Sequence, residues 1–134
     1  MNLIFNIFYN YLILPLLYAA LRFAGLFNKK IRAGILGRKR VYEKLILSAT
    51  SINKSKKLIW FHSSSLGEFE QAKPIIEKLK QEKDVNVLIT FFSPSGYENS
   101  IKYPFADLIA YIPFDTKANA EKFIAITNPT LAVI

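Results

Sequence analysis

Four short apolar runs, separated by segments with a helical pattern, occupy the second half of this 134-residue chain. The runs are rich in Ile, Val, Leu and Phe, and such near-continuous apolarity is typical of strands buried on both faces. Strands that alternate with helices at this spacing predict a parallel sheet covered by helices, a Rossmann-like α/β fold. The predicted strands are 58–61, 85–92, 108–112 and 131–134, and the predicted helices are 69–83, 95–102 and 116–127.

Pro74 lies inside the first predicted helix. A proline lacks the N–H that a helix interior needs, and its ring clashes with the preceding turn. We therefore expect this helix to begin late or to bend near its start.

Residues 3–21 form an uncharged apolar segment. It is long enough to cross a bilayer as a helix, because about 18 apolar residues suffice. We expect a membrane-anchoring helix within residues 1–27. Asn6, Asn10 and Pro15 weaken that prediction, so a helix lying in the membrane interface and a core helix of a soluble protein stay as alternatives. A cleaved signal peptide is disfavoured because no basic residue precedes the apolar segment.

Basic residues are concentrated directly after this segment. The stretch from Arg22 to Lys44 holds eight basic residues and one acidic residue, so it supplies +7 of the net charge of +8. A nucleic-acid patch, a solvated flank and a cluster that holds the chain to anionic lipid are three interpretations. Its place beside an apolar segment favours lipid, and the positive-inside rule then puts it on the cytoplasmic side. We expect 28–57 to be a basic juxtamembrane segment and connector, and 58–134 to be the α/β domain.

Three predicted strand-to-helix turns, at 62–68, 93–96 and 113–116, should converge on one edge of the sheet. Ligands bind at this carboxyl edge in open α/β sheets. The small and hydroxyl residues there suit a phosphate- or sugar-bearing ligand, because backbone N–H groups can approach it closely. Neither a P-loop nor a G-x-G-x-x-G motif occurs. With no cysteine and one histidine, neither a disulfide nor a zinc site is expected.

Glu68 is the candidate catalytic group at this edge. A carboxylate there is a candidate for acid–base work, but glutamate is also favoured in the first turn of a helix. His62 and Ser65 suggest a hydrolase pair, although that chemistry needs a base and an orienting group in defined geometry, and a lone histidine at a strand end is more often structural. Asp115 is predicted to be a turn or N-cap residue.

The pattern HxxSxGE at residues 62–68, followed by Pro74, resembles the N-terminal domain of the 3-deoxy-D-manno-octulosonic acid (Kdo) transferases. The turn TxxSPSG at 90–96 is similar to that family's second-strand motif, which usually carries threonines. YIPFDT at 111–116 and PTLAVI at 129–134 are similar as well. These ordered motifs extend over nearly the whole chain.

The resemblance implies the N-terminal half of a two-domain (GT-B) inverting glycosyltransferase. It implies CMP-Kdo as donor, a lipid A precursor as acceptor, membrane lipids as partners, and the cytoplasmic face of a Gram-negative inner membrane as location, with no cofactor, metal or nucleic acid. In that family the glutamate of the first motif is taken as the general base, which here is Glu68. The residues expected to bind acceptor or substrate are His62, Ser65, Leu66, Gly67, Ser93, Ser95 and Gly96, and those expected to attract lipid phosphates or anchor the chain to lipid are Arg38, Lys39 and Arg40.

The chain stops inside its last apolar run, where the family continues into a donor-binding domain. We therefore expect a piece of a longer protein, and no transferase activity from these 134 residues alone. Two alternatives stay open. One is a transferase of the same architecture that acts on another lipid, and the other is a non-catalytic membrane-bound interaction module.

Overall fold

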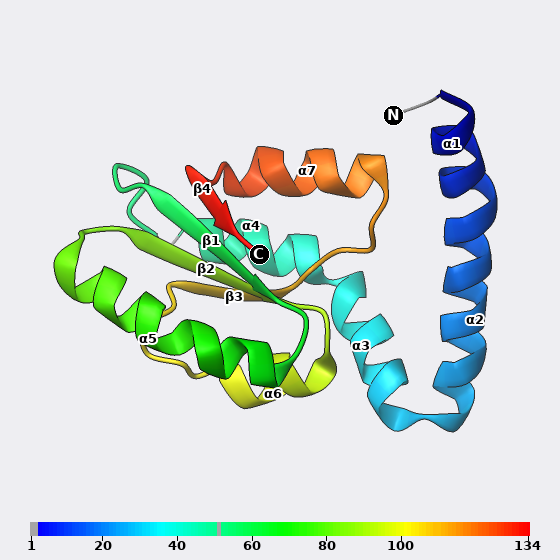
Figure 1. The fold of residues 1–134 in the computed structure, drawn as a ribbon, viewed down its shortest axis with the longest axis horizontal. Helices are drawn as coiled ribbons and strands as arrows, with labels where there is room; N and C mark the ends of the chain where they lie inside the picture. Colours follow the sequence, from blue (N-terminus) through cyan, green and yellow to red (C-terminus); the bar gives the residue numbers. More distant parts are fainter. Residues whose placement is uncertain (1–2, 51) are drawn as a thin grey trace.

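The computed structural model describes residues 3–50 and 52–134. Its body is a four-stranded sheet in the order β3-β2-β1-β4, and each neighbouring pair of strands is parallel (Figure 1). The predicted α/β fold with a parallel sheet is confirmed. The strands are β1 (Leu58–Ser63), β2 (Asn86–Phe91), β3 (Leu108–Tyr111) and β4 (Leu131–Val133).

The strand order reverses beside β1. The chain passes from β1 to β2 to β3 in one direction and then crosses to the other side of β1 to form β4. In open parallel sheets the loops on the two sides of such a reversal diverge and leave a crevice at the carboxyl ends of the strands. The end of β1 is therefore the place where this fold most readily holds a ligand.

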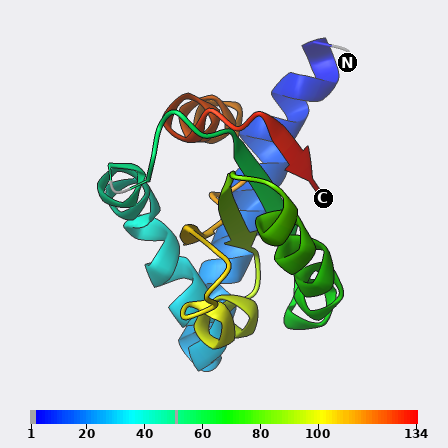
Figure 2. The ribbon, with the colours of Figure 1, turned by 90° about the vertical axis from the view of Figure 1, so that its left-hand side faces the viewer.

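Helices cover both faces of the sheet (Figures 1 and 2). On one face lie α5 (Leu66–Glu82) and α6 (Pro94–Ser100), and on the other lie α4 (Val41–Ala49) and α7 (Lys117–Thr127). Phe69 of α5 packs edge-on against Phe91, with ring centroids 5.0 Å apart. Phe123 of α7 lies 4.9 Å from the Trp60 ring on the opposite face. Successive strand side chains point to opposite faces, so each strand supplies both layers of the core.

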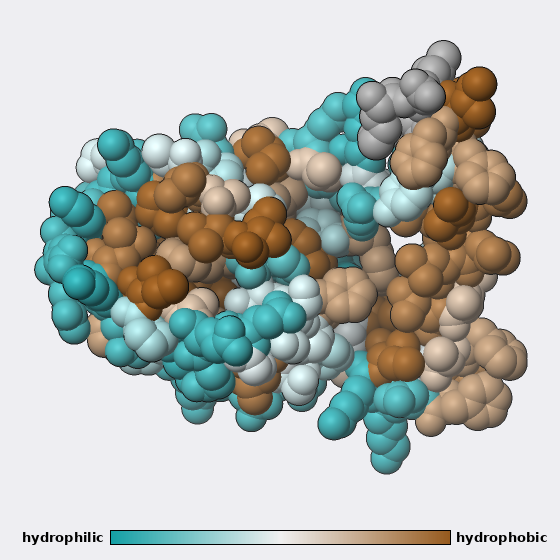
Figure 3. Space-filling model, in the orientation of Figure 1, coloured by the Kyte–Doolittle hydropathy of each residue, from teal (hydrophilic) through white to brown (hydrophobic). Residues whose placement is uncertain are grey.

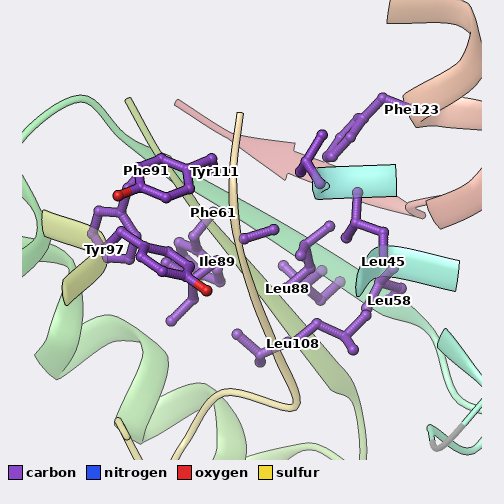
Figure 4. Close-up of a cluster of buried hydrophobic side chains, with 14 of the residues drawn as sticks. Leu45, Leu58, Phe61, Leu88, Ile89, Phe91, Tyr97, Leu108, Tyr111 and Phe123 are labelled. Atoms are coloured by element: carbon purple, nitrogen blue, oxygen red, sulfur yellow. The ribbon is translucent and has the colours of Figure 1, made fainter. Parts of the chain in front are cut away.

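The centre of the core is β2, whose six residues are all buried. Figure 4 shows core side chains from both faces of the sheet gathered around it. Val41 and Leu45 of α4 belong to the same buried cluster. Part of the basic segment therefore packs into the α/β body, while the expected domain limits at residues 27 and 57 stay a prediction.

The late start predicted for α5 and the burial predicted for β4 are wrong, whereas a bend of α5 near its start stays a prediction. Helix α5 begins at Leu66 instead of late, because Ser65 caps its first turn, and the exposed Pro74 lies within a helix that continues to Glu82. All three residues of β4 are exposed, although its apolar sequence predicted burial on both faces. This strand pairs with β1 along one edge and has no strand on its other side in the described chain.

The N-terminal apolar segment is helical and stands beside the body (Figure 1). It consists of α1 (Leu3–Phe8), a π-helical turn η1 (Tyr9–Ile13) and α2 (Leu14–Phe27), after which α3 (Lys29–Lys39) turns back toward the body. Tyr9–Phe27 is a 19-residue helix of mean hydropathy 1.4, and only 6% of its apolar window is buried. By length and composition it is able to cross a membrane, and a core helix of a soluble protein would be mostly buried. Figure 3 shows its apolar side chains on the surface.

Candidate functional site

The loop between β1 and α5 holds Glu68 at the start of a helix. Ser65 is the N-cap of α5, and its Oγ accepts the Glu68 N–H at 3.3 Å. In return, Glu68 Oε2 accepts the Ser64 N–H at 2.6 Å. This reciprocal pair is a variant of the capping box, in which a serine and a glutamate three residues later satisfy each other's backbone donors. The carboxylate of Glu68 is therefore fixed in place by the backbone of its own loop.

Glu68 is also available for chemistry. Its side chain is exposed, and Oε1 accepts no hydrogen bond from the residues that the structure describes. The carboxylate lies in the first turn of the 17-residue helix α5, at the carboxyl end of β1. One oxygen holds the loop while the other is free to accept a proton or a hydrogen bond from a ligand.

The second turn, between β2 and α6, is joined to the first. The Ser93 N–H donates to the Ser64 carbonyl at 3.0 Å. Ser93 caps α6 through its Oγ, which accepts the Gly96 N–H at 3.0 Å and lies 3.4 Å from Ser95 Oγ. Position 96 requires glycine, because a Cβ there would come within 2.6 Å of the buried Phe91 ring. The two turns form one hydrogen-bonded unit.

The third turn, between β3 and α7, is held by residues other than those expected. Thr116 is the N-cap of α7 and accepts the Asn119 N–H at 3.1 Å. Of the two roles predicted for Asp115, a turn residue or an N-cap, the structure therefore shows the turn residue. Asp115 accepts a hydrogen bond from Tyr9 Oη at 2.9 Å. The neighbouring Phe114 packs edge-on against Tyr18, with centroids 5.2 Å apart. The N-terminal helix thus contacts the body at this turn.

A cavity of about 580 Å³ opens where the three strands end. Its lining includes His62 from β1, Phe92 directly after β2 and Phe114 from the turn between β3 and α7. Ser65, Leu66, Gly67, Glu68, Ser93, Ser95 and Gly96 do not line it, so the structure divides the expected site residues between a cavity and an adjacent loop unit. A larger hollow of about 600 Å³ lies beside Lys54 and Lys57, at the amino ends of the strands, away from these turns.

His62 is half-buried in the wall of the cavity, where its Nδ1 lies 3.0 Å from Thr90 Oγ1. Burial lowers the pKa of His62 below its ordinary value. The backbone of Thr90 and the charge of Glu68 raise that pKa by smaller amounts, and the charge of Arg38 lowers it. The ring is therefore held toward its neutral form, and Glu68 is near enough to interact with it electrostatically.

Arg38 lies inside the body, so the expectation that it attracts lipid phosphates does not fit its position. It is 9% exposed, and its guanidinium donates to the carbonyls of Gly34, Phe92 and Ile112, the last at 3.0 Å. The cation also lies 4.7 Å from the centre of the Phe92 ring. Burial lowers the pKa of Arg38, and no carboxylate in the described chain forms an ion pair with it to offset this effect. Arg38 ties α3 to the ends of β2 and β3.

Lys39 and Arg40 follow Arg38 in the sequence but are exposed. For these two residues, attraction of lipid phosphates stays a prediction. Among the described residues, no three His, Asp or Glu side chains gather closely enough to hold a metal ion.

The sequence did not predict the residues that hold His62 and the strand ends in place. Trp60 and Thr90 contact each other beneath His62, and Arg38 holds the strand ends. One feature of the sequence could have indicated Thr90, because it is a hydroxyl residue inside an apolar run. Nothing in the spacing of Arg38 or Tyr9 distinguishes them from their neighbours.

Comparison with known proteins agrees with the motifs of these loops. Residues 39–134 match the protein family described as 3-deoxy-D-manno-octulosonic-acid transferase (kdotransferase). The match extends over more than half of the chain and includes all four strands and the three turns.

Several relatives share part of the sequence. The 3-deoxy-D-manno-octulosonic acid transferase of Aquifex aeolicus is 31% identical over 85 residues, which are 63% of this chain and 24% of that protein. The enzyme of the same name from Haemophilus influenzae is 30% identical over 79 residues, 57% of this chain and 18% of the relative. A bifunctional glycosyltransferase/methyltransferase of Fusobacterium nucleatum is 31% identical over 75 residues, 53% of this chain and 12% of the relative. The chain thus spans 24% or less of the length of these relatives, and no solved structure matches it.

Proposed function

Because the chain belongs to the Kdo transferase family through its N-terminal glycosyltransferase domain, we propose that it is the acceptor-binding half of a Kdo transferase. In this proposal the protein transfers Kdo from CMP-Kdo to a lipid A precursor, and the chain supplies one Rossmann-like domain of a GT-B enzyme. The observation that carries the proposal is the exposed Glu68 carboxylate, fixed at the start of α5 beside the carboxyl end of β1.

Glu68 acts as the general base in this mechanism. Its free oxygen takes the proton from the acceptor hydroxyl while that oxygen attacks the anomeric carbon of Kdo. The bond from the anomeric carbon to the phosphate of CMP breaks on the opposite side, so the configuration inverts and CMP leaves with the bonding electron pair. A positioned base of this kind contributes about 10²–10⁴-fold to the rate.

The first turn of α5 supplies the anion-binding part of the site. The N–H groups of Leu66 and Gly67 belong to this turn and have no intrahelical partner. Such groups, together with the helix dipole, favour a phosphate or carboxylate. We assign to them the acceptor phosphate or the Kdo carboxylate, with Ser65, Ser93, Ser95 and Gly96 shaping the loops that hold them.

The N-terminal helix attaches the protein to the cytoplasmic face of a membrane and lies along its surface. If Tyr9–Phe27 crossed the bilayer, its length of roughly 28 Å would carry Tyr9 to the side opposite the basic flank. Tyr9, however, bonds to Asp115 of the body, and a spanning helix would draw that carboxylate across the hydrocarbon at high cost. A helix that lies in the interface keeps the hydrogen bond between Tyr9 and Asp115. It also allows the exposed residues Lys29, Lys30, Lys39 and Arg40 to contact anionic lipid.

An acceptor assay tests the proposed function. The full-length protein is incubated with CMP-Kdo and a lipid A precursor, and lipid products are identified by mass spectrometry. We expect the precursor to gain Kdo, and residues 1–134 alone to transfer none. Failure with this acceptor, together with transfer to another lipid, would assign the enzyme to a different acceptor. Turnover of CMP-Kdo by residues 1–134 alone would contradict the assignment of this chain to one half of the enzyme.

The membrane arrangement has its own test. Since the chain has no cysteine, single cysteines can be introduced as Ile4→Cys and, as the control on the basic side, Lys29→Cys. A membrane-impermeant thiol reagent applied from the cytoplasmic side should label both variants. Labelling of the Ile4→Cys variant from the opposite side only would show that the helix spans the membrane.

A further inference from the structure

Three polar side chains meet on the face of the sheet that α7 covers. Trp60 and His62 are two residues apart on β1, so they share this face, and His62 is paired with Thr90 of β2 in the strand register. Thr90 is fully buried, in the middle of an apolar strand. Its hydroxyl is the meeting point, since Trp60 Nε1 lies 2.8 Å and His62 Nδ1 lies 3.0 Å from Thr90 Oγ1.

A count of hydrogens decides how these groups are connected. The indole nitrogen of Trp60 is a donor only, so Thr90 Oγ1 accepts from it. The hydroxyl of Thr90 has one hydrogen, and His62 Nδ1 is the remaining partner of Thr90 Oγ1 among the hydrogen bonds of the described residues. If Nδ1 carried a proton, the Thr90 hydrogen would have no acceptor at a fully buried position, which proteins avoid. Thr90 therefore donates to Nδ1.

We propose that Trp60 and Thr90 are positioning residues that hold His62 as the neutral tautomer with its proton on Nε2. Nε2 makes no hydrogen bond with the residues that the structure describes, and His62 lines the cavity at the strand ends. His62 thus presents one N–H donor to an oxygen of a ligand, from a carboxylate, a phosphate or a hydroxyl. Because Nδ1 is occupied and the ring is neutral, His62 does not compete with Glu68 as a base.

The tautomer follows from contacts within this chain, whereas the role of His62 as a ligand donor rests on the proposed function. One opposing influence comes from the backbone of Thr90, which favours the protonated ring. A Nδ1–H directed at that backbone is the competing arrangement. The two arrangements place the proton on different nitrogens, so a direct observation separates them.

NMR of the 134-residue chain in detergent micelles gives that observation, because His62 is its only histidine. Histidine labelled with ¹⁵N on both ring nitrogens reports the tautomer through the nitrogen shifts and the couplings to the ring hydrogens. Above the histidine pKa we expect a protonated Nε2 and an unprotonated Nδ1. A protonated Nδ1 in the wild-type chain would overturn the proposal, and this measurement requires neither donor nor acceptor. Its outcome is therefore independent of the Kdo transfer assay.

Two substitutions at Thr90 test the positioning role. Thr90→Ser retains the hydroxyl and should retain the Nε2–H tautomer. Thr90→Val has a similar shape but no hydroxyl, and we expect the Nδ1 resonance to shift toward the position of a mixture of both tautomers. An unchanged tautomer in a folded Thr90→Val chain would contradict the role of Thr90. If that variant fails to fold, loss of the tautomer in the Thr90→Ser chain, or its absence in the wild type, still overturns the proposal.

Trp60→Phe tests the second step of the chain of hydrogen bonds. It keeps an aromatic ring against Phe123 but removes the N–H that Thr90 Oγ1 accepts. Without this donor the orientation of the Thr90 hydroxyl is less fixed, so we expect a partial shift toward the Nδ1–H tautomer, smaller than in Thr90→Val. No shift in this variant would remove Trp60 from the positioning role.

Discussion

The α/β body and the N-terminal helices use similar apolar sequence in opposite ways. All six residues of β2 are buried between two layers of helices, whereas 6% of the apolar window of Tyr9–Phe27 is buried. An apolar run indicates only that a segment avoids water, and the neighbours of that segment decide whether protein or lipid covers it. The two regions meet at the carboxyl edge of the sheet, through Arg38 of α3 and Tyr9 of the N-terminal helix. Both α3 and the N-terminal helix therefore contact the sheet edge that holds the candidate site.

Arg38 is the strongest link between the two regions, and its removal should have the largest effect on stability. Arg38→Met keeps the length of the side chain but leaves the partly buried carbonyls of Phe92 and Ile112 without this donor. We expect the free energy of unfolding to fall by roughly 1–3 kcal/mol, from the usual cost of polar groups left unsatisfied away from water. Denaturant unfolding measures this value. The control is Lys39→Met at the adjacent exposed position, and equal effects of the two substitutions would show that Arg38 is no more than a surface charge.

The close approach of α3 to the sheet is the second link. A Cβ at Gly37 would overlap the Tyr111 ring, which is held in place by Tyr97 stacked 4.2 Å away. We expect Gly37→Ala to lower the free energy of unfolding by roughly 1–3 kcal/mol, since the core would be overpacked. Gly67→Ala is the matched control, because the nearest atom to its Cβ is Ser65 Oγ at 4.0 Å. That control should leave stability unchanged or slightly raised, and a similar loss in both variants would contradict the packing argument.

The edge itself should respond to pH through His62. Burial lowers the pKa of this histidine in the folded chain below the ordinary value of 6.5. The unfolded chain then binds the proton more readily, so stability rises with pH in this window. The contribution of His62 to the free energy of unfolding is fully present above about pH 6.5. It is lost as the pH falls from 6.5 to the pKa of His62 in the folded chain. Denaturant unfolding of wild type and His62→Gln across pH 4.5–7.5 isolates the effect, and an identical pH dependence of the two chains would exclude it.

The hydrogen bond from Tyr9 to Asp115 is the weakest link, because it is exposed. Tyr9→Phe should cost at most about 1 kcal/mol, and so should speed hydrogen exchange in the turn 113–116 by roughly fivefold or less. Tyr11→Phe changes a tyrosine of the same π-helical turn that is 80% exposed, and it should leave exchange in that turn unchanged. Equal exchange in the two variants would mean that the helix is not held by this contact.

The regular part of the fold could be predicted from the sequence, because local patterns determine it. Runs of apolar residues predicted all four strands to within a few residues, and the HxxSxGE pattern located the loop that holds Glu68. The start of α5 was missed because the cap at Ser65 fixes it, whereas the exposed Pro74 is accommodated further along. Burial of β4 was wrongly predicted because burial depends on a neighbouring strand and not on composition.

Long-range contacts could not be predicted in the same way. Arg38 lies among basic residues of equal appearance, and only the approach of α3 through Gly34 and Gly37 gives it carbonyls to bind. The contact between Tyr9 and Asp115 joins residues 106 positions apart, which no local pattern records. The link between Trp60, Thr90 and His62 depends on the register of two strands.

The most direct test of the account is the rate of Kdo transfer by full-length Glu68→Gln, compared with Glu70→Gln. Glutamine at position 68 can still accept the Ser64 N–H through its amide oxygen, so the cap is preserved while the base is removed. Glu70 is an exposed carboxylate of the same helix that pairs with Lys73, which makes it a matched control. We predict that Glu68→Gln binds membranes normally and loses at least ~100-fold in rate, while Glu70→Gln transfers Kdo at the wild-type rate. A near-normal rate for Glu68→Gln would show that Glu68 is a helix cap and not the catalytic base.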